Sequence, residues 1–126
     1  MYCTMKPLLA QAMEDGQGVP AFNIHALEVV PVMAKAADAV KCPVILQVSV
    51  STAKYIGYSL LASIVKKVSE DMTVDVALHL DHATDLEDIR GALDGGFSSV
   101  MYDGSKLPFE ENIANTLKAV ELARNA

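Results

Sequence analysis

Basic residues are scarce in this sequence. Lysine and arginine together number 10 against 16 aspartates and glutamates, which leaves a net charge of −6. Nucleic acids and anionic membrane surfaces are bound by clustered Lys and Arg, so we expect neither a nucleic-acid partner nor a membrane partner. A small phosphorylated molecule needs only one or two local donors, and this composition does not exclude it.

Cysteine is also rare, and long apolar runs are missing. Cys3 and Cys42 lie far apart and show no metal-ligand spacing, which favours two free thiols in a reducing cytosol. No apolar run has the length of a membrane span, and the N-terminus lacks the basic and apolar segments of a secretory signal. We therefore expect a cytoplasmic protein.

The sequence that remains is rich in apolar residues and alternates between two kinds of segment. Its length of 126 residues, 52% of them hydrophobic, predicts a single domain over residues 1–126. Short apolar strands separated by amphipathic helices predict an α/β fold with a parallel sheet buried on both faces. The expected elements are a leading helix at 4–14, strands at 19–24, 43–49, 74–81 and 97–103, and helices at 26–40, 57–70, 86–93 and from 108 onward.

Two places fit this pattern less well. Pro31 falls inside the expected helix at 26–40, so that helix either bends there or begins later. Residues 50–56 form the longest expected connection between elements.

Polar residues gather where each expected strand ends. Parallel strands of barrels and open α/β sheets bind ligands at their carboxyl ends, so four polar strand ends predict a site there. The residues concerned are Asn23, Gln47 and Ser49, Asp81 and His82, and Asp103 and Ser105.

The alternation of strand side chains strengthens this prediction. Asn23, Gln47, Ser49, Asp81 and Asp103 share one parity, which places them on one face of the sheet. The opposite parity is wholly apolar and is expected to face the helices. It comprises Phe22, Ile24, Val44, Leu46, Val48, Val76, Leu78, Leu80 and Val100.

Each polar residue has an ordinary structural explanation beside the functional one. Asp81 is a general acid/base, or a helix cap or buried ion-pair partner. His82 is a zinc ligand, or a donor to the backbone. Asp103 is a carboxylate near a metal, or part of a turn with Gly104. Ser49 donates a hydrogen bond to a substrate phosphate, or solvates a loop. His79 is expected to be a hydrogen-bonded core histidine.

Six segments, taken in order, resemble class II fructose-bisphosphate aldolases and the closely related tagatose-bisphosphate aldolases. They are residues 18–23 (GVPAFN), 43–49 (PVILQVS), 53–57 (AKYIG), 78–82 (LHLDH), 96–105 (GFSSVMYDGS) and 108–112 (PFEEN). The resemblance implies the N-terminal half of a zinc-dependent TIM (βα)8 barrel, that is, a parallel (βα)4 unit with a leading helix. It also implies a lyase of glycolysis that reversibly cleaves fructose 1,6-bisphosphate to dihydroxyacetone phosphate and glyceraldehyde 3-phosphate.

The resemblance further implies a role for five residues. Asp81 matches the catalytic acid/base, which exchanges a proton with the C4 hydroxyl or the aldehyde oxygen. His82 matches one of three zinc histidines, and Asp103 a carboxylate of an auxiliary metal position. Ser49 matches a contact to the glyceraldehyde-phosphate part of the substrate, and Asn23 a polar wall of the pocket.

Other parts of the family's site have no match in this sequence. The two further zinc histidines, a glutamate near the metal and the phosphate-binding loops belong to later strands, and His25 and His79 match no ligand position. The isolated chain is therefore expected to be weakly active or inactive. Two alternatives stay open: a tagatose-bisphosphate aldolase, or a catalytically silent half-barrel that binds a partner or forms a homo-oligomer through its open sheet edges.

Overall fold

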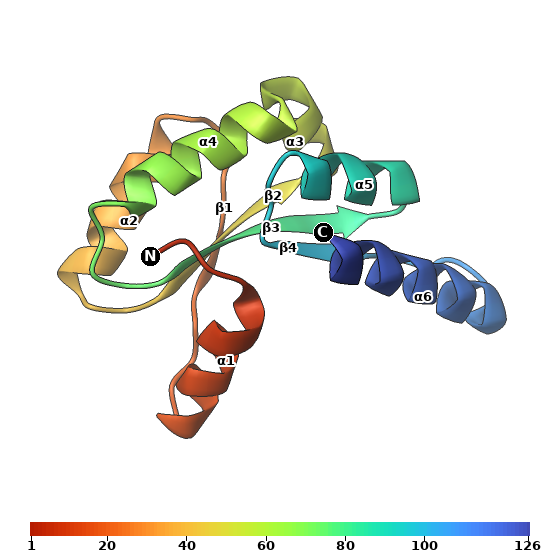
Figure 1. Cartoon of the computed structure of the whole chain (residues 1–126), viewed down its shortest axis with the longest axis horizontal. Helices are drawn as coiled ribbons and strands as arrows, with labels where there is room; N and C mark the ends of the chain where they lie inside the picture. Colours follow the sequence, from red (N-terminus) through yellow and green to blue (C-terminus); the bar gives the residue numbers. More distant parts are fainter.

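The computed structural model describes all residues, 1–126, and contains one parallel sheet of four strands. The strands lie in chain order, β1-β2-β3-β4, and each is followed by at least one helix (Figure 1). Their bounds are β1 Ala21–Asn23, β2 Val44–Ser49, β3 Val76–Ala83 and β4 Ser99–Tyr102. This confirms the predicted parallel α/β fold of four βα units.

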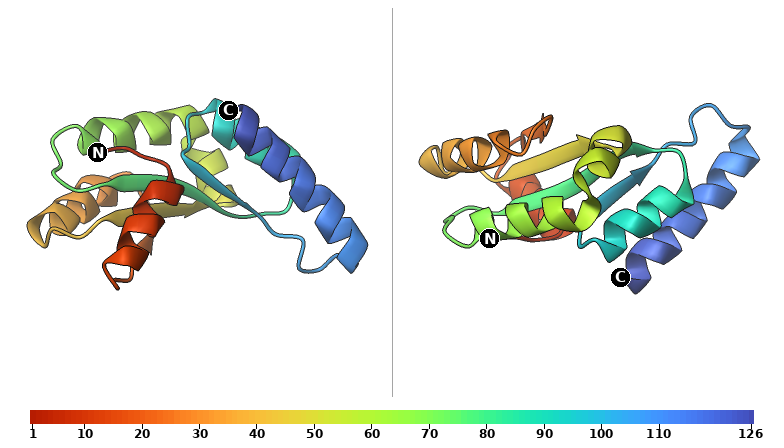
Figure 2. Two further views of the ribbon diagram at one scale, coloured as in Figure 1. Left: turned by 60° about the horizontal axis from the view of Figure 1, so that its bottom comes forward. Right: turned by 90° about the horizontal axis from the view of Figure 1, so that it is seen from above.

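Helices lie on both sides of the sheet (Figures 1 and 2). Their bounds are α1 Met5–Glu14, α2 Val29–Ala39, α3 Val50–Ile56, α4 Tyr58–Ser69, α5 Leu86–Asp94 and α6 Phe109–Asn125. Figures 1 and 2 show α1 and α4 on opposite sides of the sheet. None of the six helices combines the length and the apolar character needed to cross a bilayer.

The main core lies between the sheet and the helices that follow the strands. It is a cluster of 21 buried residues, in which strand residues such as Leu46 and Leu78 share the interior with Leu61 and Val65 of α4. All the residues predicted to face the helices belong to it or pack against it, apart from Phe22. Phe22 is 51% exposed because β1 is an edge strand with a neighbour on one side only.

The opposite face of the sheet is covered only near the amino ends of the strands. There Leu8 of α1 packs on Ile45 and Ala77 in a second, small cluster. Further along the same face, Gln47 and Asp81 are half-buried and Ser49 is exposed. The polar strand ends therefore lie on an accessible surface.

One expected helix boundary was wrong, and one helix was not predicted. Helix α2 begins at Val29 and not at residue 26, so Pro31 lies in its first turn, where a backbone N–H has no helical acceptor in any case. Residues 50–56 form α3 instead of an irregular connection. The Ser49 hydroxyl caps α3 by accepting a bond from the Thr52 N–H, and Gly57, with a φ of 97°, turns the chain into α4.

Leu78 provides a test of the helix-side core. It is fully buried, so Leu78→Ala should lower the free energy of unfolding by about 2–5 kcal/mol through lost burial and the cavity left behind. Urea unfolding measures this, and Leu60→Ala is the control because Leu60 is half exposed and should cost no more than about 0.5 kcal/mol. Equal effects of the two changes would contradict the described core. A single transition in all three proteins is expected if residues 1–126 are one domain.

Candidate functional site at the carboxyl ends of the strands

An extra residue in β3 shapes the site. Leu80 pairs with Val100 and Ala83 pairs with Tyr102, so Asp81 and His82 together oppose a single residue of β4. This is a β-bulge, and at it His82 adopts a left-handed backbone with a φ of 53°. Leu80 and Ala83 both point into the helix-side core, which leaves the two residues between them outside it.

The bulge brings two neighbouring side chains to the same region. In a regular strand, adjacent residues face opposite sides of the sheet, so His82 would point toward the helices. Here Nε2 of His82 lies 3.7 Å from Oδ1 of Asp81. The alternation argument placed Asp81 correctly on the accessible face, but it gave no reason for His82 to join it.

Asp103 forms a hydrogen bond with Nδ1, the other ring nitrogen of His82. The Nδ1–H of His82 donates to Oδ2 of Asp103 across 2.8 Å, and the N–H of Ser105 donates to Oδ1 across 3.0 Å. Hydrogen bonds from Ser105 and His82 hold the pKa of Asp103 well below its usual range. The pKa of His82 is raised, first by the bond to Asp103 and then by the charge of Asp81.

Gln47 was expected on this face among the polar strand ends, although no specific role was predicted for it, and it connects two of the predicted residues. Its Nε2 donates to Oδ1 of Asn23 across 2.6 Å and to Oδ2 of Asp81 across 3.3 Å. Asn23, Gln47 and His79 lie side by side in register on three adjacent strands. Parity placed Gln47 on this face correctly, but its bonds to Asn23 and Asp81 depend on distances between strands.

His79 lies deeper on the same face. Its Nδ1 shares a hydrogen bond of 2.7 Å with the hydroxyl of Ser99, and its Nε2 lies 4.0 Å from Oδ1 of Asp81. Burial lowers the pKa of His79, so the ring is held neutral beside the carboxylate. It is hydrogen-bonded as expected, but it also forms part of the surroundings of Asp81.

Ser49 stands slightly apart from this set. It lies opposite Asp81 in the β2–β3 register, but its hydroxyl bonds to Ser51 and Thr52 within its own turn, at 3.2 and 3.1 Å. Four of the five predicted residues are thus linked. Gln47 joins Asn23 to Asp81, and His82 contacts both Asp81 and Asp103. Ser49 lies at the border of this set.

Comparison with known proteins identifies relatives along the whole chain. A model of the family "Fructose-bisphosphate aldolase class-II" matches residues 3–126. The fructose-bisphosphate aldolase of Geobacillus stearothermophilus is 44% identical over 123 residues, and that of Staphylococcus aureus strain Mu50 is 42% identical over the same number. Each match covers 95% of this chain and 43% of the relative, so the chain spans less than half the length of these relatives.

Solved structures agree with the sequence relatives. The YdjI aldolase of Escherichia coli K12 superposes with a TM-score of 0.89 at 26% identity, over 99% of this chain and 47% of that one. A fructose-1,6-biphosphate aldolase of Coccidioides immitis gives a TM-score of 0.85 at 31% identity, over 93% of this chain and 46% of that one. The four βα units thus correspond to a little under half of such an aldolase, as expected for half a barrel.

The pKa values of the two histidines of the site should be shifted in opposite directions. Relative to the ordinary histidine pKa of about 6.5, His79 should lose its proton at lower pH and His82 at higher pH. The stability that protonated His82 contributes is complete below its unfolded pKa and is lost as pH rises through the folded value. For His79 the sign reverses, because the folded state binds fewer protons, so stability falls as pH drops below the unfolded pKa.

NMR titration of the ring protons measures both pKa values. Asp103→Ala should move the titration of His82 down and change that of His79 less, because only His82 bonds to Asp103. Indistinguishable titrations of His79 and His82 in the unsubstituted chain would contradict the described surroundings.

Proposed function

This chain belongs to the class II fructose-bisphosphate aldolase family, and we propose that it supplies the first half of an enzyme that reversibly cleaves fructose 1,6-bisphosphate. The products would be dihydroxyacetone phosphate and glyceraldehyde 3-phosphate, and the proposal includes a role in glycolysis and a cytoplasmic location. The proposal is supported by a family match over residues 3–126 and by relatives named fructose-bisphosphate aldolase. The observation that carries it is the placement of Asp81 and His82 together on the accessible face of the sheet.

Asp81 is the proposed acid/base. One of its oxygens accepts a hydrogen bond from Gln47, and the other faces the rings of His79 and His82. A carboxylate fixed in this way and still 22% exposed can take a proton from a substrate hydroxyl during cleavage and return it during condensation. Asn23, held by Gln47, would line the pocket, and Ser49 would contact the phosphorylated aldehyde part of the substrate.

Zinc is the metal expected for this family, and the donors present fit one part of a zinc site. His82 is 63% exposed on its side chain and has one ring nitrogen bonded to Asp103, so the other nitrogen is free to bind a metal. Bound zinc would polarise the substrate carbonyl, which removes the need for a Schiff-base lysine. Catalytic zinc sites usually take three protein ligands, whereas no group of three or more potential ligands forms within this chain. The remaining ligands would come from outside residues 1–126.

A chimera tests this function. Residues 3–126 of this chain would replace the matching segment of the Geobacillus stearothermophilus aldolase, whose remainder supplies the other strands. The chimera should cleave fructose 1,6-bisphosphate when zinc is present, and Asp81→Asn should lower its kcat by about 10²–10⁴-fold because proton transfer is lost. Asp94→Asn, on the exposed end of α5, is the matched control and should leave kcat unchanged.

The isolated chain should show little or no cleavage with zinc in the same assay. Robust turnover by residues 1–126 alone would show that the site is complete without further strands. A folded chimera without activity would contradict the proposed function itself.

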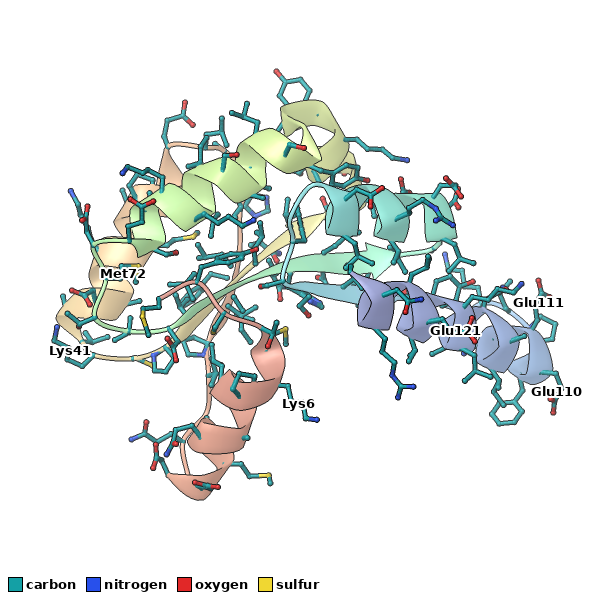
Figure 3. All side chains as sticks on the ribbon, viewed as in Figure 1. Lys6, Lys41, Met72, Glu110, Glu111 and Glu121 are labelled. Atoms are coloured by element: carbon teal, nitrogen blue, oxygen red, sulfur yellow. The ribbon has the colours of Figure 1, made fainter.

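A second proposal, self-association, is favoured by the two ends of the sheet. Strands β1 and β4 are both edge strands, and unpaired strand edges readily accept another strand. Apolar surfaces lie beside both edges. On α6, Phe109, Ile113, Leu117 and Val120 form an exposed stripe at helical spacing, with Phe109 74% exposed. Figure 3 shows Glu110, Glu111 and Glu121 along the same helix.

The other end carries an apolar groove. It has a volume of about 430 Å³ and is lined by side chains of β1, α2 and β2, among them Phe22, Val32 and Val40. Helices α2 and α6 lie at opposite ends of the molecule in every view (Figures 1 and 2). Two copies placed head to tail would therefore set each stripe against the partner's groove and pair each β4 with the partner's β1.

Sedimentation velocity over a range of concentrations tests this homodimer. Leu117→Glu and Val32→Glu should each weaken association, because each places a charge in an apolar contact. A mixture of the two variants should associate better than either alone, since one of the two contacts then joins an unchanged stripe to an unchanged groove. Tyr55→Glu, at a position 91% exposed on α3, is the control and should have no effect.

A monomer at all concentrations would exclude self-association. If the mixture associates no more strongly than either variant alone, the head-to-tail arrangement is excluded.

A further inference from the structure

We propose that Lys54 is a positioning residue, which through its ion pair with Asp88 holds Ser49 in place for the phosphorylated end of the substrate. This inference rests on the proposed function, because it assumes that Ser49 contacts the substrate. Lys54 lies on α3, the helix that follows β2, and Asp88 lies in the first turn of α5, the helix that follows β3. The pair therefore joins two consecutive connections at the carboxyl ends of the strands.

Asp88 is a buried carboxylate with two partners. Its side chain is only 11% exposed, and its Oδ1 lies 2.6 Å from Nζ of Lys54. The same oxygen accepts a hydrogen bond of 3.2 Å from the hydroxyl of Tyr58. Burying a carboxylate is costly unless it is paired, and its position at the amino end of α5 adds a favourable interaction with the helix dipole. Loss of the Lys54 charge would leave this buried carboxylate with one neutral partner.

Tyr58, at the start of α4, fixes Asp88 from the other side. Burial and the charge of Asp88 raise the pKa of Tyr58 to about 12, so its hydroxyl keeps the proton that it donates. The Tyr58 ring packs edge-on against Phe97, with 5.8 Å between the ring centroids, and a side chain at Gly91 or Gly95 would collide with Tyr58. The packing of α5 against α4 therefore sets the position of Asp88 independently of Lys54.

Helix α3 connects Lys54 to Ser49. The helix has only seven residues, and a helix of this length is not stable in water without contacts to the rest of the fold. Ala53 is fully buried, and Lys54 forms the one ion pair between α3 and another element. The Ser49 hydroxyl accepts the N–H of Thr52 in the first turn of the same helix. The orientation of this hydroxyl thus depends on a helix that Lys54 keeps in place.

The anchoring of α3 bears on how the substrate would bind. Ser49 and Asp81 lie opposite each other on β2 and β3. In the proposed function, a phosphate contacts Ser49 while proton transfer occurs at Asp81. Loosening α3 would therefore weaken the phosphate contact and leave the chemistry at Asp81 unchanged. A contact that is equally strong in the ground state and the transition state affects KM and not kcat.

Amide hydrogen exchange of the isolated chain tests the anchoring without requiring activity. Lys54→Met should speed exchange of the Gly57 N–H, which bonds to Ala53 in α3, by about tenfold, and Lys54→Arg should restore slow exchange. Exchange within the buried strands should not change, which separates loosening of α3 from unfolding of the chain. Lys67→Met is the matched control, because Lys67 pairs with Glu70 at the same 2.6 Å on the exposed surface of α4. Unchanged exchange in Lys54→Met, or an equal change in Lys67→Met, would overturn the anchoring.

Kinetics of the chimera test the effect on substrate binding. Lys54→Met should raise KM for fructose 1,6-bisphosphate by about 3–10-fold and change kcat by less than about twofold, whereas Lys54→Arg and Lys67→Met should change neither. In a Ser49→Ala background, Lys54→Met should have little further effect on KM, because it acts through the Ser49 hydroxyl. A lower kcat at constant KM, or an equal rise in KM with and without the Ser49 hydroxyl, would refute the positioning role.

The two measurements distinguish failure of this inference from failure of the proposed function. A chimera that cleaves the substrate, and whose KM is unaffected by Lys54→Met, would refute the positioning role and leave the function intact. A folded chimera that does not cleave would refute the proposed function, and with it the role of Lys54 in substrate binding. Hydrogen exchange would still decide whether the ion pair anchors α3.

Discussion

The bulge in β3 is the constraint on which the site depends. It adds one residue between Leu80 and Ala83, both of which stay in the helix-side core, and thereby places Asp81 and His82 on the accessible face together. The left-handed backbone of His82 costs about 1–3 kcal/mol, and such strain persists only where the surroundings hold it. Here the surroundings are the buried Leu80 and Ala83 on either side of the bulge and the bond from His82 to Asp103.

The core on the helix side of the sheet supports this arrangement. The apolar face of the sheet packs against the helices as one 21-residue cluster, so the strand ends are fixed by the core and not by mobile loops. On the accessible face, hydrogen bonds run across the strands from Asn23 through Gln47 to Asp81. Side chains held on rigid strands keep a constant geometry, which proton transfer and metal ligation require. The side chains that this chain contributes are therefore fixed by its own core.

The sequence was sufficient to predict the parallel sheet, its apolar face and the cluster of polar strand ends. These follow from alternation and composition, which are local properties. The bulge could not be predicted, because the expected strand ended at residue 81 and alternation assumes no extra residue, whereas β3 extends to Ala83. Helix α3 was missed although Ser49 and Gly57 are typical boundary residues, because a seven-residue segment is too short to show helical periodicity. The role of Gln47 depends on distances between strands, which only the fold provides.

The chain comprises four βα units, which correspond to a little under half of the aldolase structures it resembles. Its two ends carry an exposed apolar stripe on α6, an apolar groove beside α2 and the two edge strands of the sheet. A crystal structure of the purified chain tests most directly whether the bulge brings Asp81 and His82 together. We predict a positive φ at His82, with its ring bonded to Asp103 and facing Asp81. An extended His82 with its ring among the helices would contradict the account.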